Sequence, residues 1–170
     1  RQMCIRDRSD PQGTPVAEWK EQVQIPAGNT VSCSMHGTIR DPKCWSPEHP
    51  DLYGMETWYE TTDEDGKKIS YLADKQKVGI RVAEFDADRG FFLNGVPMKI
   101  KGVCVHHDAG CLGAAVTKEV WHRRFAKLKE CGCNAIRCSH NPHMPELYEL
   151  CDTMGFLVMD EAFDEWENAK

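Results

Sequence analysis

Hydrophobic and polar positions alternate with a period of two in the first half of the chain. From about residue 16 to residue 85, short alternating runs are separated by turn residues, and runs 55–61 and 69–72 flank Asp65-Gly66. This pattern predicts two strands joined by a hairpin turn. Further strands are predicted around Val23, Ile25 and Val31, and around Val78, Ile80 and Val82. Several short strands without a helix predict a β-sandwich over residues 10–88.

A proline-rich segment, residues 44–53, interrupts these strands with the sequence CWSPEHPDLY. Its large apolar residues are Trp45, Leu52 and Tyr53. Large side chains in an irregular crossing segment pack against the nearest hydrophobic surface, so we expect these three to cover the core of the sandwich.

The second half of the chain changes to a pattern of strands and helices. Asn94-Gly95 predicts a tight hairpin over residues 91–98, because a type I′ turn needs two positive φ angles. Apolar runs at 98–105, 134–138 and 156–159 predict strands, and apolar residues at helical spacing lie between them. The residues of these helical stripes are Trp121, Phe125, Leu128, Leu147, Leu150 and Cys151. The order βαβαβ predicts parallel strands, as in the first part of a (β/α)8 barrel over residues 89–170.

The length of 170 residues is below the roughly 250 of a complete barrel, so we expect a truncated multi-domain α/β protein containing about three barrel strands. Residues 1–9 (RQMCIRDRS) show no apolar period and resemble a translated sequencing adapter or a disordered end. We therefore leave residues 1–9 out of the predicted fold.

The charge balance of 27 acidic to 21 basic residues gives a net charge of -6 and argues against a nucleic-acid partner. No apolar run is long enough to span a membrane. Nine cysteines, an odd number, lie mostly within predicted elements and read as small buried residues, which favours the cytoplasm. Cys131-Gly132-Cys133 has the wrong spacing for zinc, so we expect no metal and no other cofactor.

Polar residues follow each of the three predicted parallel strands. His106, His107 and Asp108 follow the first, and Arg137 and His140 belong to the second. The third is followed by Asp160, Glu161 and Asp164. Because the carboxyl ends of barrel strands face one pocket, these side chains should converge there. If Arg137, His140 and Glu161 lay on different sides of the sheet, the prediction would fail.

Three ordered motifs carry a resemblance to a known family. The segments LNGVPMKIKGVCVHHD, NAIRCSHNP and LCDTMGFLVMDEAFDEW are similar to glycoside hydrolase family 2, and most similar to its β-galactosidase branch. WSPEHPDLY resembles the immunoglobulin-like domain that precedes the barrel in this family, which implies that residues 10–88 are part of an immunoglobulin-like β-sandwich. The resemblance implies a retaining, exo-acting β-glycosidase that forms a glycosyl-enzyme intermediate between two carboxyl groups. In the family those carboxylates come from later barrel strands, and we expect them beyond residue 170.

The resemblance also implies roles for individual residues. Arg137 matches the arginine that supports the nucleophile, and the substrate-binding candidates are His106, His107, Asp108, His140, Asn141, Glu161, Asp164 and Trp166. Glu167 stands where a magnesium-site pattern of the family has histidine. The implied partner is a glycoside or oligosaccharide, and we expect the whole protein to be a homo-oligomer.

Several alternatives stay open at this stage. Within the family, the activity could be that of a β-glucuronidase or a β-mannosidase. Outside it, the chain could be a non-catalytic carbohydrate-binding module, or a barrel metallohydrolase that uses His106, His107 and His140. Adjacent histidines on a strand point to opposite faces, which argues against the metal. Arg137 and Glu161 could also form a plain ion pair, and His140 could bond to loop backbone.

Overall fold

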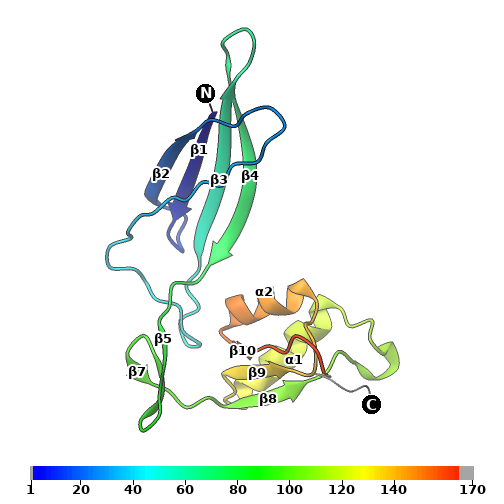
Figure 1. Cartoon of the computed structure of the whole chain (residues 1–170). Helices are drawn as coiled ribbons and strands as arrows, with labels where there is room; N and C mark the ends of the chain where they lie inside the picture. The colour runs from blue at the N-terminus through cyan, green and yellow to red at the C-terminus, as the bar shows by residue number, and fades with distance from the viewer. Residues whose placement is uncertain (1, 165–170) are drawn as a thin grey trace. The chain divides into compact units, whose positions relative to one another are not determined.

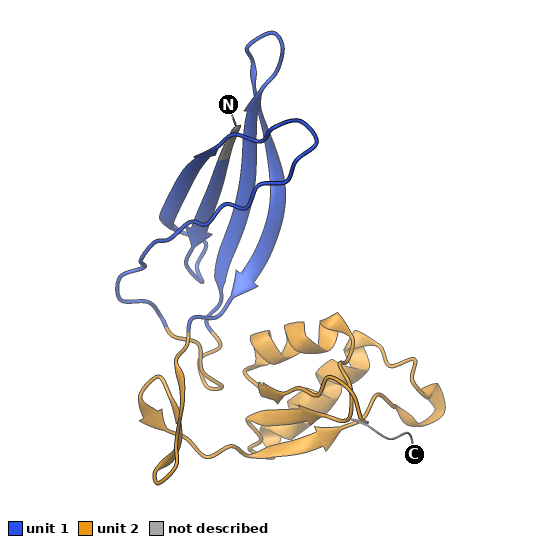
Figure 2. Ribbon diagram, viewed as in Figure 1, with its two compact units in different colours: residues 1–43, 51–80 blue, residues 44–50, 81–170 orange. Residues whose placement is uncertain are grey.

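The computed structural model describes residues 2–164 and divides into two compact units, coloured separately in Figure 2. Unit 1 comprises residues 1–43 and 51–80, and unit 2 comprises residues 44–50 and 81–170. Among the described residues, no helix combines the length and the apolar character needed to cross a membrane.

Unit 1 is built on a four-stranded antiparallel sheet (Figure 1). Its strands are β1 (Gln2–Ser9), β2 (Pro15–Val23), β3 (Tyr53–Thr62) and β4 (Lys68–Val78), in the order β2-β1-β3-β4. The expected hairpin joins β3 to β4, and the Asp63 carboxylate accepts hydrogen bonds from the backbone N–H groups of Asp65 and Lys67. Gly66 supplies the positive φ that the turn requires.

The expectation that residues 1–9 stand outside the fold was wrong. Residues 2–9 form β1, which pairs with both β2 and β3. Ile5 on one face is buried, while Arg8 on the other face lies over the Trp19 ring at 5.7 Å. The apolar period does not show in the sequence because Asp7 follows Ile5 on the same face of the strand.

Two other strand predictions for this region were wrong. β2 ends at Val23, and Ile25 and Val31 lie in a long segment without strands. The run Val78 to Val82 is split, since β4 ends at Val78 and β5 (Ala83–Asp86) begins the next sheet. Proline and glycine at positions 26, 28 and 79 interrupt pairing in both places.

Unit 2 begins with a small antiparallel sheet of β5, β6 (Gly90–Leu93) and β7 (Val96–Pro97). The predicted hairpin turn is confirmed, because Asn94 has φ 53° and Gly95 has φ 76°. This sheet places residues 81–88 with the second unit, whereas the sequence pattern assigned them to the first.

The remainder of unit 2 has the predicted βαβαβ order. Its elements are β8 (Gly102–Val105), the short 3-10 helix η1 (Gly110–Leu112), α1 (Lys118–Glu130), β9 (Ala135–Cys138), α2 (Pro145–Met154) and β10 (Leu157–Met159). The three strands are parallel in the order β10-β9-β8 (Figure 1). Pro145 opens α2, and Gly155 ends it in the left-handed region.

The core of unit 2 lies between this sheet and its two helices. Trp121 and Phe125 of α1, Leu147 of α2, Ile136 of β9, and Phe156 before β10 are all buried there. Alternation along β9 then places Arg137 on the opposite face, next to Cys104 of β8. The expected burial of cysteines holds for Cys138 and Cys151 but was wrong for Cys104 and Cys131, which are exposed.

The expected place of Trp45 was also wrong. Trp45 packs within unit 2, where its side chain is 2% exposed and its indole N–H donates to the backbone carbonyl of Asp152 at 2.8 Å. That carbonyl lies in the last turn of α2 and has no partner within the helix. Trp45 therefore caps the carboxyl end of α2.

Candidate functional site

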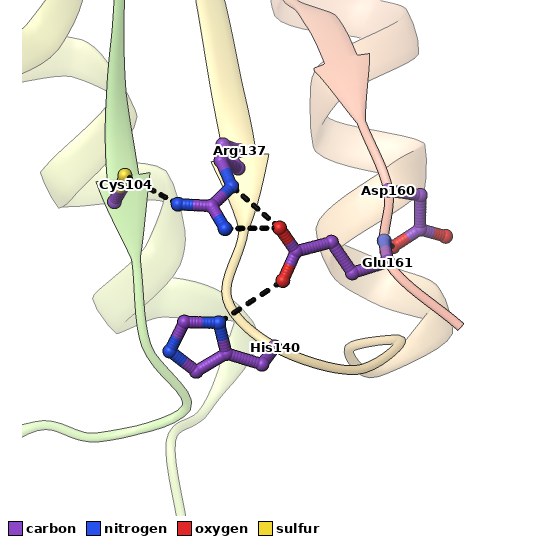
Figure 3. Close-up of polar contacts among 5 residues, drawn as sticks. All are labelled: Cys104, Arg137, His140, Asp160 and Glu161. Carbon is purple, nitrogen blue, oxygen red and sulfur yellow. Dashed lines mark hydrogen bonds and ion pairs between the residues drawn. The ribbon is translucent and has the colours of Figure 1, made fainter. Parts of the chain in front are cut away.

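Arg137, His140 and Glu161 meet where β9 and β10 end, as the sequence predicts (Figure 3). The Arg137 Nε–H group donates to Glu161 Oε1 at 2.5 Å, and Arg137 Nη2 contacts the same oxygen. His140 Nδ1 lies 3.1 Å from Glu161 Oε2. Each oxygen of one carboxylate therefore holds a different side chain from the neighbouring strand and its loop.

The charges of this cluster stabilise one another. Burial alone would raise the pKa of Glu161, but hydrogen bonds from Arg137 and His140 outweigh it, so the pKa lies below its ordinary value. The pKa of Arg137 is raised, first by its contact with Cys104 and then by Glu161. Glu161 is thus a carboxylate and Arg137 a cation at neutral pH.

Cys104 completes the contacts of the guanidinium from the other side. Arg137 Nη1 lies 3.5 Å from the Cys104 sulfur, which sits at the paired position on β8. A guanidinium has five N–H groups. The contacts with Cys104 and Glu161 leave N–H groups on Arg137 that can donate to a further acceptor.

A hollow of about 310 Å³ adjoins the cluster. Its lining residues are Arg137, His140, Asp160, Glu161, Ala162, Phe163 and Asp164. Exposed His106 lies beside it, with its ring centroid 5.5 Å from that of His140 in an edge-to-face arrangement. The hollow can hold a small polar ligand between carboxylate, guanidinium and imidazole groups.

Asp160 is turned away from the cluster (Figure 3). Its carboxylate oxygens lie 2.9 Å and 3.0 Å from the Tyr148 hydroxyl, which also accepts the backbone N–H of His143 at 2.9 Å. Burial, followed by smaller effects that include the nearby Asp160 carboxylate, raises the pKa of Tyr148 to about 12. The hydroxyl is therefore protonated at neutral pH and can donate to Asp160.

His106 and His107, which follow β8, contact different partners: the His106 ring meets that of His140, and the His107 ring meets that of His143. His107 stacks on His143 with ring centroids 5.1 Å apart, and His143 in turn meets the edge of Trp121. His143 is 7% exposed and its ring nitrogens have no hydrogen-bond partner within the described chain. Burial, then the neighbouring His107, lowers the pKa of His143. His107 thus lies outside the cluster.

Other candidates lie farther from the cluster or outside the described residues. Asp108 is exposed and pairs loosely with Arg124 of α1 at 4.0 Å, while Asn141 is exposed in the loop after β9. Asp164 lines the hollow. Trp166, like Glu165 and Glu167, lies outside residues 2–164. Within that range, no three histidine, cysteine or acidic side chains are grouped closely enough to hold a metal ion.

Tyr148 and His143 were missed in the sequence. Tyr148 is a partly buried residue of a short amphipathic helix, where a tyrosine that packs against the core is common. His143 follows the SHNP motif without a pattern of its own, so nothing in the one-dimensional sequence marked either residue.

Two family models match consecutive parts of the chain. The model described as "Glycosyl hydrolases family 2" matches residues 6–81, and the model for the TIM barrel domain of that family matches residues 86–168. The predicted succession of a sandwich domain and the start of a (β/α)8 barrel is confirmed by these matches and by the parallel sheet.

Individual relatives agree with the family models. The β-galactosidase BoGH2A of Bacteroides ovatus is 46% identical over 161 residues, which are 95% of this chain and 18% of that protein. A β-glycosidase structure from Bacteroides vulgatus has a TM-score of 0.84 at 38% identity, covering 100% of this chain and 21% of the other. A β-glucuronidase structure from Bacteroides uniformis has a TM-score of 0.83 at 34% identity, covering 95% and 19%. The chain thus spans about a fifth of the length of these relatives.

Proposed function

The chain belongs to glycoside hydrolase family 2, and on that premise we propose that the whole protein is a retaining, exo-acting β-galactosidase. The observation that carries the proposal is the meeting of Arg137, His140 and Glu161 beside a hollow at the ends of parallel strands. In this proposal the acid/base and nucleophilic carboxylates come from later barrel strands, and these residues form part of the sugar pocket.

His140 has a defined role in this proposal. Because Glu161 is ionised, a neutral His140 ring donates its Nδ1–H to that carboxylate. Its Nε2 atom is then an acceptor, able to receive a hydrogen bond from a sugar hydroxyl. Glu161 therefore sets both the direction and the tautomer of the imidazole.

Arg137 stabilises the charge of the nucleophilic carboxylate in this proposal. Its guanidinium is held on two sides by Glu161 and Cys104, so it is fixed before substrate binds. Its remaining N–H groups can donate to the nucleophilic carboxylate and keep that group ionised and able to attack. In this proposal, the ion pair with Glu161 holds the Arg137 guanidinium in position for its contact with the nucleophile.

A neutral sugar suits the hollow better than a uronic acid. Three of its described lining residues are acidic, and the charge of Arg137 is already paired with Glu161. A substrate carboxylate would meet repulsion there. β-Glucuronidase is the second candidate, because a structure of that name is among the similar proteins.

The test is a comparison of substrates with the full-length gene product. We expect kcat/KM for an aryl β-galactoside to exceed that for the β-glucuronide and β-mannoside at least tenfold, about 1.4 kcal/mol in transition-state binding. Proton NMR of the first product should show the β-anomer, the sign of retention. Failure to cleave any of the three glycosides contradicts the proposal, and strict dependence on bound zinc would favour a metallohydrolase instead.

A variant of His140 tests its part in the site. His140→Ala should lower kcat/KM by about 2–4 kcal/mol of transition-state binding if the ring holds a sugar hydroxyl. His122→Ala is the matched control, because His122 is exposed on α1 of the same unit. Equal kcat/KM for both variants would remove His140 from the pocket.

A further inference from the structure

One hydroxyl group connects the two loops that carry the site residues. Tyr148 of α2 accepts the backbone N–H of His143, which lies three residues after His140 in the loop that follows β9. It donates to Asp160, which follows β10 and directly precedes Glu161. We call these contacts the Tyr148 brace.

We propose that Tyr148 is a positioning residue, which holds Glu161 and His140 in register for glycoside hydrolysis. The inference rests on the proposed function, and it assigns the residue an action through Asp160 and His143 with no contact to substrate. Tyr148 acts on each of the two loops through a different hydrogen bond.

The loop after β10 carries Asp160 and Glu161. Side chains of consecutive extended residues point in opposite directions. The brace holds Asp160 toward α2, and Figure 3 shows Glu161 directed the other way, toward Arg137 and His140. The Glu161 backbone N–H also donates to Asp160 Oδ1 at 3.1 Å. Fixing Asp160 therefore fixes the direction of Glu161.

The loop after β9 carries His140. Asn141 and Pro142 in this loop are exposed, while His143 is buried. The bond from the His143 N–H to Tyr148 ties the far end of the loop to the helix, and His140 is tied to Glu161 at 3.1 Å. The loop after β9 is therefore connected to Asp160 through Tyr148 and to Glu161 through His140, so the brace sets the separation of the two loops.

The hydroxyl can be removed without removing the ring. The Tyr148 ring packs against the hydrophobic core of unit 2, and phenylalanine keeps that contact. Tyr148→Phe leaves the His143 N–H and the Asp160 carboxylate without this partner. The loops then lose a shared anchor while the packing of α2 stays intact.

The experiment uses the full-length protein and Tyr148→Phe, with Tyr71→Phe as the matched control because Tyr71 is exposed in unit 1. We expect Tyr148→Phe to lower kcat/KM about 10- to 100-fold, the range expected when reacting groups are displaced by up to about 1 Å. In a Glu161→Gln background the same change should have little further effect, because the residue being positioned is already altered. The control should leave kcat/KM unchanged.

Hydrogen exchange tests the brace separately from activity. Peptides covering residues 139–144 and 160–164 should exchange faster in Tyr148→Phe, since the His143 amide loses its partner. Asp160→Asn should also speed exchange of these peptides, because it alters the other partner of the Tyr148 hydroxyl.

Unchanged exchange together with unchanged kcat/KM would overturn the role of Tyr148, and so would faster exchange with unchanged kcat/KM. An equal loss of activity in the Glu161→Gln background also overturns it, because it indicates general destabilisation. A wild-type protein that cleaves no glycoside overturns the proposed function, while the exchange result still decides whether the brace exists.

Discussion

Replacement of Trp45 tests the assignment of residues 44–50 to unit 2. The indole is buried, donates to the Asp152 carbonyl at the end of α2, and has the Arg81 guanidinium 5.0 Å from its ring centroid. The backbone carbonyl of Trp45 also accepts a hydrogen bond from the Asn94 side chain at 3.1 Å. All of these partners lie in unit 2, so loss of the indole should destabilise that unit.

The expected magnitude follows from what each substitution removes. Trp45→Phe loses one neutral hydrogen bond, about 1 kcal/mol net, and part of the buried apolar area, about 1 kcal/mol more. Trp45→Ala removes the whole buried ring and should cost about 3–5 kcal/mol. Because each 1.4 kcal/mol is about tenfold in an equilibrium, α2 should open roughly 30-fold more often in the first variant and roughly 150- to 5,000-fold more often in the second.

Hydrogen exchange of the full-length protein measures this opening. Peptides covering α2 report on unit 2, and peptides covering β3 and β4 report on unit 1. Trp58→Phe is the matched control, because the Trp58 indole N–H bonds to Glu56 within the sheet of unit 1. We expect the Trp45 variants to speed exchange in α2 and the Trp58 variant to leave α2 unchanged.

The opposite pattern of exchange would contradict the assignment of residues 44–50 to unit 2. If Trp45→Phe left exchange of α2 at the wild-type rate and accelerated exchange of β3 and β4, the segment would belong with the sandwich, as its place in the sequence first suggested.

Three further predictions concern unit 2. Gly155→Ala should destabilise α2 by more than about 1–2 kcal/mol, the cost of a non-glycine residue in the left-handed conformation, because its Cβ would lie 2.3 Å from the Pro47 carbonyl oxygen. Gly132→Ala is the control in the same exchange assay. Gly132 has a similar φ and open space around an added Cβ, so this variant gives the backbone cost alone. Burial, and after it the neighbouring His107, lowers the pKa of His143, so the unfolded chain binds the proton more readily than the folded one. The contribution of His143 to the free energy of unfolding should therefore be complete above pH 6.5 and should fall as the pH drops below that value. His143→Leu should flatten this dependence, as measured by denaturant titrations at pH 7 and pH 5. The 170-residue chain alone should hydrolyse no aryl β-galactoside. It should also aggregate, because within residues 2–164 its parallel sheet has unpaired edges and exposes Met159 and Val103. Turnover, or a soluble monomer with a cooperative melt, would contradict this expectation.

Much of the site was predictable because it depends on periodic structure. Strand alternation places Arg137 on the face opposite to Ile136, and parallel strands bring their carboxyl ends to one edge. The meeting of Arg137, His140 and Glu161 follows from those two regularities. The His106 and His107 rings contact different partners, His140 and His143, which weakens the metallohydrolase alternative.

What the sequence did not reveal depends on contacts between distant residues. Trp45 bonds to a carbonyl 107 residues away, and no local pattern shows which of two cores a large side chain enters. Tyr148 is recognised only when the loops after β9 and β10 are both in place. β1 was missed because Asp7 interrupts the face of the strand that carries buried Ile5.

In the proposed function, the ends of β8, β9 and β10 form part of a sugar pocket. The most direct measurement is a crystal structure of the full-length protein with a bound galactose-derived inhibitor. We predict sugar hydroxyls within about 3.2 Å of His140 Nε2, with the ring of the sugar seated in the hollow beside Arg137 and Glu161. An inhibitor bound at a different place, with this hollow open to solvent, would contradict the claim.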